Sequence, residues 1–144
     1  MALSGKVYGK NLAFKLDTQG GVLKDISSYV KSVDGLPGEV DMGDVTTGGS
    51  TGYKYLPGLG KADFSLECVF DDAADSAYDV IKNFMSDTAT RSFEFYPAGT
   101  TAGYVKINGE CRIKKVSLPV KVTDPVIFTI EASVDGAITI GTAA

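Results

Sequence analysis

Residues 61–70 have the sequence KADFSLECVF, the clearest strand pattern in the chain. Apolar side chains occupy every second position from Phe64 to Phe70, and polar side chains lie between them. An alternation of period two predicts a β-strand that buries one face and exposes the other. Such a strand needs neighbours to complete its backbone hydrogen bonds, so further strands are expected on both sides of it.

The segment before this strand predicts a β-hairpin over residues 25–46. Two runs rich in β-branched and alternating residues are joined by the turn-forming residues 34–38, DGLPG. Asp-Gly and Pro-Gly pairs between two such runs favour a reversal of the chain. Gly43 interrupts the alternation of the second run, which indicates a bulge or bend there.

The segment after it contains a long alternating run at residues 104–116. Asn108 and Gly109 suit a two-residue hairpin turn, but the unbroken alternation favours one long strand. The remaining predicted strands are residues 11–17, 92–97, 117–123 and 126–134.

Residues 73–86 predict the only α-helix. Their apolar residues recur at helical spacing from Ala74 to Met85, which predicts one buried face. Asp71 and Asp72 precede this stripe, where carboxylates favour the positive end of a helix.

About eight strands and one helix, without strand–helix alternation, predict a mainly β fold. We expect two packed antiparallel sheets, a β-sandwich or partly open barrel, flanked by one α-helix. The 144 residues suit a single domain, 1–144. Within it we expect an N-terminal arm at residues 1–10, a long inter-strand loop at 46–60 and a C-terminal tail at 135–144. The loop, TTGGSTGYKYLPGLG, is rich in glycine and contains exposed aromatic candidates, and unstructured loops of this length are usually functional.

The composition disfavours catalysis. The chain has no histidine, which removes histidine-based triads, dyads and metal sites. Cys68 and Cys111 lie on apolar strand faces and are expected to be buried thiols, since a catalytic cysteine needs a nearby base. The acidic residues at 71–75 are interpreted as the start of a helix rather than a metal site. We therefore expect no catalytic residues, no metal and no cofactor.

The charge and the apolar pattern limit the partners. The chain has 14 Lys and Arg against 18 Asp and Glu, a net charge of −4, which argues against gripping nucleic acid through its phosphates. No apolar run approaches the roughly 20 residues of a membrane span, and the amino end lacks a signal-peptide pattern. We expect a chain that folds in a cytoplasm and has no membrane partner.

Residues 25–47, DISSYVKSVDGLPGEVDMGDVTT, resemble the major tail tube protein of long-tailed, siphovirus-type bacteriophages. The resemblance continues in YLPGL at Tyr55–Leu59 and in FEFYPAGTTAG at Phe93–Gly103. It extends over roughly residues 10–140, and it rests on several motifs in the right order rather than on one catalytic signature.

The resemblance implies a structural virion protein with a fold related to type VI secretion tubes and contractile-tail tubes. Such proteins form hexameric rings that stack into a tube, in which one sheet of each subunit joins its neighbours to line the lumen. The implied location is the virion tail, with assembly in the host cytoplasm. The implied partners are copies of the chain, tail tip and tail terminator proteins, the tape measure protein within the lumen, and DNA in transit that is not specifically bound. The loop is expected to contact other subunits and rings through Thr46, Thr47, Gly48, Gly49, Tyr53, Tyr55 and Leu56.

An acidic or neutral bore suits such a tube, because it keeps the phosphate backbone of DNA mobile whereas a basic bore holds it. The polar faces of the predicted hairpin and the later strands supply the lumen-facing candidates, which are Asp34, Glu39, Asp41, Glu94 and Glu110.

Two alternatives remain open from the residues alone. One is the tube protein of a contractile or secretion-type injection machine, which has a similar fold and a different cargo. The other is a monomeric β-sandwich that binds a ligand, although the absence of tryptophan weakens a sugar-binding version. An enzyme is the least favoured class.

Overall fold

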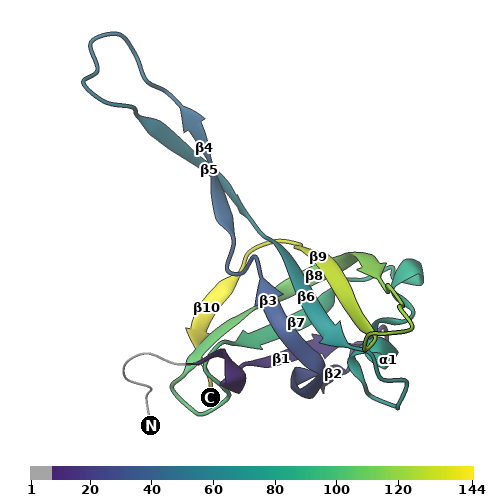
Figure 1. The fold of residues 1–144 in the computed structure, drawn as a ribbon. Helices are drawn as coiled ribbons and strands as arrows, with labels where there is room; N and C mark the ends of the chain where they lie inside the picture. Colours follow the sequence, from purple (N-terminus) through teal and green to yellow (C-terminus); the bar gives the residue numbers. More distant parts are fainter. Residues whose placement is uncertain (1–7) are drawn as a thin grey trace.

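The computed structural model describes residues 8–144 and shows a mainly β fold with two antiparallel sheets and one short α-helix, as the sequence predicts (Figure 1). The larger sheet has the strand order β2-β1-β7-β8-β9-β6-β3, and β10 pairs with β8. Its strands are β1 (Ala13–Asp17), β2 (Leu23–Asp25), β3 (Val30–Asp34), β6 (Asp63–Val69), β7 (Arg91–Tyr96), β8 (Val105–Ser117), β9 (Ile127–Val134) and β10 (Thr139–Thr142).

Strand β8 connects the two halves of the larger sheet. Its first half pairs with β7, where Ile107 lies opposite Phe95, and its second half pairs with β9, where Val116 lies opposite Ile130. The alternation of residues 104–116 therefore predicted one long strand correctly, and the turn at Asn108-Gly109 does not form.

The two halves of this sheet curl toward each other and enclose the core. Phe14 and Phe93 come from β1 and β7, and Phe64 comes from β6 on the other half. The ring centroid of Phe64 lies 6.0 Å from that of Phe14 and 5.0 Å from that of Phe93. All three are at most 3% exposed, so the alternating faces identified in the sequence do form the core.

The predicted hairpin over residues 25–46 is wrong. Its first run, β3, pairs with β6, where Val33 lies opposite Leu66. Its second run forms β4 (Glu39–Asp44), which pairs with β5 (Tyr55–Lys61) in a separate two-stranded sheet. β3 gains buried apolar contacts from β6 that β4 does not offer, because every residue of β4 is exposed.

The predicted loop at residues 46–60 is therefore partly a strand. Glycine and proline at positions 57, 58 and 60 lower strand propensity, and this concealed β5 in the sequence. Similarly, the tail at residues 135–144 contains β10. The strand predicted at residues 117–123 does not form, because residue 117 ends β8 and residues 118–123 belong to the β8–β9 connection. Of the predicted N-terminal arm, residues 1–7 lie outside the described part.

The helix is much shorter than residues 73–86. It extends over α1 (Ala77–Ile81) and is followed by a separate 3-10 turn, η3 (Phe84–Ser86). Its N-cap is Ser76, whose hydroxyl accepts a hydrogen bond from the Asp79 backbone N–H at 3.3 Å, so Asp71 and Asp72 are not its caps. Asp75, with φ +61°, interrupts the chain just before this cap. Two further turns of 3-10 helix, η1 (Gly9–Asn11) and η2 (Ser27–Tyr29), flank β1 and β3.

The two cysteines are buried free thiols, as predicted. Both are 0% exposed, and burial raises the pKa of Cys68 and of Cys111 from 9.0 to about 12. A thiol with a raised pKa stays protonated and is a poor nucleophile at neutral pH.

Alkaline pH is expected to destabilise the fold through these thiols. Between pH 9 and 12 the unfolded chain releases thiol protons that the folded chain retains, so their contribution is complete below pH 9 and is lost as the pH rises toward 12. Within this window the free energy of unfolding should fall by about 1.4 kcal/mol per pH unit for each thiol. Chemical denaturation at pH 8, 9.5 and 10.5 measures the slope. The variant with Cys68→Ala and Cys111→Ala should flatten it, and an unchanged slope would assign the effect to other groups.

Candidate interaction surface

Strands β4 and β5 form a long hairpin that projects away from the body of the molecule (Figure 1). We call residues 39–61 the arm and residues 44–56 its tip. Every residue of both strands is exposed, and the two strands pair with each other rather than with the larger sheet. The arm therefore gains little from the core, and a contact with another molecule is the expected reason for its exposed apolar residues.

Two glycines at the base of the arm fix its departure from the body. Gly35 and Gly38 have φ values of +100° and +115°, which favour glycine. A Cβ atom on Gly38 would lie 2.5 Å from the carbonyl oxygen of Lys61 and 2.6 Å from the Cβ of Ala62. A Cβ atom on Gly35 would overlap the carbonyl oxygen of Asp63. These close approaches turn the chain out of β3 and into the arm.

Exposed ion pairs cross the arm near its base. The ammonium of Lys61 lies 3.6 Å from Glu39 and 3.4 Å from Asp41, and the two carboxylates raise the pKa of Lys61. The register shifts between Val40 and Met42, which places a bulge close to the predicted bend at Gly43. Exposed ion pairs of this kind contribute little to the free energy of unfolding, so they do not by themselves hold the two strands together.

The tip is ordered by its own hydrogen bonds. The Thr46 backbone N–H donates to Asp44 Oδ1 at 2.9 Å, and the Lys54 N–H donates to Thr46 Oγ1 at 2.9 Å. The hydrogen bonds from Thr46 lower the pKa of Asp44, which therefore stays ionised. The rings of Tyr53 and Tyr55 stack with centroids 6.5 Å apart. The tip thus presents two aromatic rings beside one carboxylate.

The arm brings together all seven residues that the sequence assigned to contacts between subunits. Thr46 to Gly49 and Tyr53 lie in the connection between the strands, and Tyr55 and Leu56 begin β5. The assignment from the sequence did not include the other exposed apolar residues of the arm. These are Val40, Met42, Val45 and Leu59, with exposures of 47–85%.

The five acidic lumen candidates lie on three parts of the molecule. Glu39 and Asp41 belong to the arm, and Asp34 ends β3. Glu94 and Glu110 lie on one outward face of β7 and β8, because Glu94 is opposite Asn108 and Ser92 is opposite Glu110.

Glu94 and Glu110 differ in the side chains that they contact. Glu94 lies 3.7 Å from the ammonium of Lys106 and accepts a hydrogen bond from the Tyr96 hydroxyl. Glu110 accepts a hydrogen bond from Thr90 Oγ1 at 3.3 Å. Glu94 is thus partly neutralised, whereas Glu110 contributes a negative charge to this face.

Residues 8–144 contain no cluster of three or more His, Cys, Asp or Glu suited to a metal ion. In the same part of the chain, no helix has the length and apolar character needed to cross a membrane.

No protein-family model matches the sequence, and no curated protein sequence matches it. Solved structures do match its backbone. A chain from the tail of an empty gene transfer agent particle has a TM-score of 0.74 and 19% identity, covering 94% of this chain and 99% of that chain. The SPP1 tail tube has a TM-score of 0.70 and 12% identity, covering 95% of this chain and 80% of that chain. The chain has the tail-tube fold.

The same fold occurs in contractile machines. The sheath–tube complex of an extracellular contractile injection system contains a chain with a TM-score of 0.69 and 12% identity, covering 96% of this chain and 93% of that chain. The tail-tube fold expected from residues 10–140 is therefore confirmed over nearly the whole chain. At these identities the shared property is the fold, and function is argued from this chain's own surfaces.

Proposed function

We propose that this chain is a structural protein of a virion tail that assembles with copies of itself into a hollow tube. The observation that supports it is the arm, a projecting hairpin with exposed apolar side chains along its length. Exposed apolar surface of this kind marks a protein interface. The tail-tube fold of the body supports the choice of a second copy as the partner.

The assembly we propose is a hexameric ring that stacks into the tube. The tail of the gene transfer agent, whose chain shares this fold, has C6 symmetry. In residues 8–144, β2 and β3 are the end strands of the larger sheet, so each has an edge without a partner strand. Unpaired edges are templates for strand pairing, and copies joined at these edges would extend the sheet around a bore.

The proposed partners follow from a tube. Its two ends would meet tail tip and tail terminator proteins, and its lumen would hold the tape measure protein and later pass DNA without binding it specifically. Nothing in this role requires catalysis, and we propose none.

A tube in a contractile or secretion-type machine is the second candidate. It is favoured by one observation, the fold match to the sheath–tube complex of a contractile injection system. A contractile tube needs an outer surface that contacts a sheath. Electron microscopy of intact particles that contain this chain separates the two candidates, because only the contractile tube should lie inside a sheath.

Negative-stain electron microscopy and sedimentation over a range of protein concentrations test the proposal. We expect hollow filaments of constant width that become more numerous as concentration rises. A single monomer species at every concentration, with no rings or filaments, would instead support a monomeric binding module.

The lumen assignment of Asp34, Glu39, Asp41, Glu94 and Glu110 is part of this proposal and leads to a prediction for the β7–β8 face. Tubes of the variant with Glu94→Lys and Glu110→Lys, assembled with short linear duplex DNA, should retain the DNA at low salt and release it at high salt. Native tubes should not retain it. Co-sedimentation measures the retained fraction.

Closed circular plasmid is the control, because it cannot thread through a bore. If the variant tubes retain plasmid as well as the short duplex, these two glutamates face outward rather than toward the lumen.

A further inference from the structure

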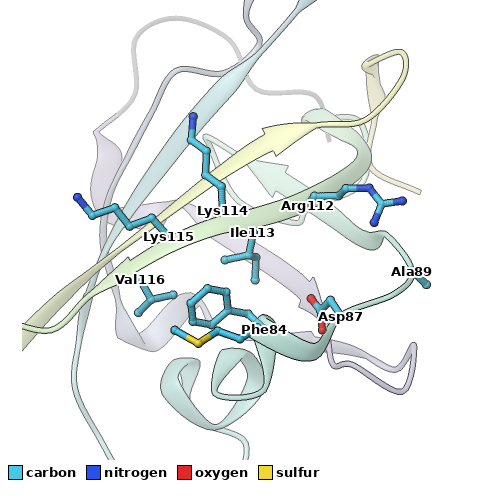
Figure 2. Close-up of a pocket in the computed structure, with 9 residues that line it drawn as sticks. Phe84, Asp87, Ala89, Arg112, Ile113, Lys114, Lys115 and Val116 are labelled. Atoms are coloured by element: carbon cyan, nitrogen blue, oxygen red, sulfur yellow. The ribbon is translucent and has the colours of Figure 1, made fainter.

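A second apolar surface, which is partly exposed, lies between β8 and the turn η3. We call it the Met85 patch and define it as Phe84, Met85, Ile113, Val116 and Leu118. Two hollows of about 470 and 500 Å³ adjoin here, and both are lined by Phe84, Met85 and Val116. In Figure 2 the side chains of Ile113, Val116 and Phe84 gather on one side of β8 and form the floor of the first hollow.

Met85 itself is unusual, because it is 89% exposed in the middle of this apolar surface. Its side chain lines both hollows. A methionine side chain adapts to the shape of a partner, and its sulfur makes favourable contacts with aromatic rings. The patch is therefore suited to a ligand that presents aromatic side chains.

The rim of the patch is basic. Arg112, Lys114 and Lys115 line the first hollow, and their charged groups point away from its floor (Figure 2). Their carboxylate partners lie at 3.0, 3.8 and 3.9 Å, and all three side chains are at least half exposed. Exposed pairs with this geometry are weak, so the rim can still attract a negative charge.

The arm tip has the complementary features. It presents the stacked rings of Tyr53 and Tyr55, and Asp44, whose carboxylate is ionised, lies opposite Tyr55 in the strand register. The tip has one aromatic ring for each of the two hollows, and its negative carboxylate is opposite in charge to the cationic rim. Cations near tyrosine rings add a further attraction.

The position of the two surfaces decides whether they meet within one chain or between chains. The arm leaves the body on the side away from α1, and η3 follows α1 directly in the chain (Figure 1). The arm tip therefore points away from the patch of its own chain. A contact between unlike surfaces on different copies is heterologous, and repetition of it builds rings or filaments rather than closed dimers.

We infer that the arm tip of one copy docks on the Met85 patch of another copy, with Tyr53 and Tyr55 in the two hollows and Asp44 at the basic rim. This inference rests on the proposed self-assembly and names the surface that receives the arm. It makes the patch as necessary for tube growth as the arm.

Engineered thiols test the contact directly. Gly52 lies in the tip with open space around it, and Ala89 is an exposed residue at the edge of the first hollow, so both accept cysteine with little disturbance. The native Cys68 and Cys111 are buried, with pKa values of about 12, and do not compete for reagent near neutral pH. The double variant with Gly52→Cys and Ala89→Cys is assembled and treated with a short bis-maleimide. We expect a ladder of covalently linked chains, and peptide mass spectrometry should identify the link between positions 52 and 89.

A matched variant gives the control. Gly52→Cys is combined with Ile140→Cys, an exposed aliphatic position on β10 that lies outside both surfaces. This pair should give at least tenfold less linked chain than the 52–89 pair. Tubes that link 52 to 140, or that give no ladder with the 52–89 pair, would overturn this inference and leave the proposed tube intact. Absence of any assembly of the native chain would overturn the proposed function itself.

Discussion

Removal of residues 48–53 should leave the chain folded and abolish tube formation. The deletion shortens the connection of the arm to Thr46 and Thr47, and the Val45 N–H already donates to the Lys54 carbonyl at 3.0 Å across this position. A two-residue connection is common in β-hairpins, so the arm can close. Since the removed residues make no contact with the core, we expect the melting temperature to change by less than about 2 °C.

The loss of assembly should be large because the deletion removes Tyr53, which is 79% exposed and stacks on Tyr55. Electron microscopy should show at least a hundredfold fewer tubes than the native chain at equal concentration. Ser50→Ala keeps the length of the tip and its aromatic rings, and it should assemble normally. Tubes of normal number and length from the shortened chain would show that the arm tip has no part in assembly.

Alternation predicted the strands that bury one face and failed where no face is buried. β6 and β8 were identified because the apolar residues of each strand recur at every second position. Phe64 and Leu66 of β6 and Ile107 of β8 pack in the core. The arm strands β4 and β5 have no buried residue, so backbone hydrogen bonds set their pairing, and the turn at Gly35 and Gly38 directs β4 away from β3. Such information is not carried by an apolar pattern.

The candidate surfaces were accessible to sequence reasoning to different degrees. The unusual composition of residues 46–60 pointed to the arm tip, although not to the hairpin that presents it. The Met85 patch was hidden because helical spacing placed Met85 on a buried stripe, and the helix ends at Ile81. Once η3 turns the chain, Met85 faces outward beside β8, a segment about 30 residues away that no local pattern connects to it.

Arg91 was also beyond sequence reasoning, since arginine is rarely fully buried. It is 1% exposed. Its Nε and Nη2 donate to the two carboxylate oxygens of Asp87 at 2.7 and 3.0 Å. Its Nη1 donates to the carbonyl oxygens of Asp17 at 3.0 Å and of Val80 at 2.7 Å. One side chain thus joins the end of β1, the helix α1, and the segment that follows Met85.

Arg91→Met should destabilise the fold by about 3–5 kcal/mol, because it leaves a largely buried carboxylate and two carbonyl groups without their partner. For a domain of this size the melting temperature should fall by about 10 °C or more. Arg112→Met is the matched control. Arg112 also donates through Nε to a carboxylate, that of Asp135 at 3.0 Å, but its side chain is 53% exposed, so its loss should cost less than about 1 kcal/mol.

The two variants separate a buried charge network from an exposed pair of the same chemistry. Equal stability of both in urea denaturation would show that the Arg91 network adds nothing beyond a surface ion pair. If the network matters as described, Asp87→Leu added to Arg91→Met should recover part of the lost stability, because it removes the carboxylate left without a partner. The recovered fold should still assemble poorly, because Asp87 and Arg91 hold the segment that carries Met85 against α1 and β1.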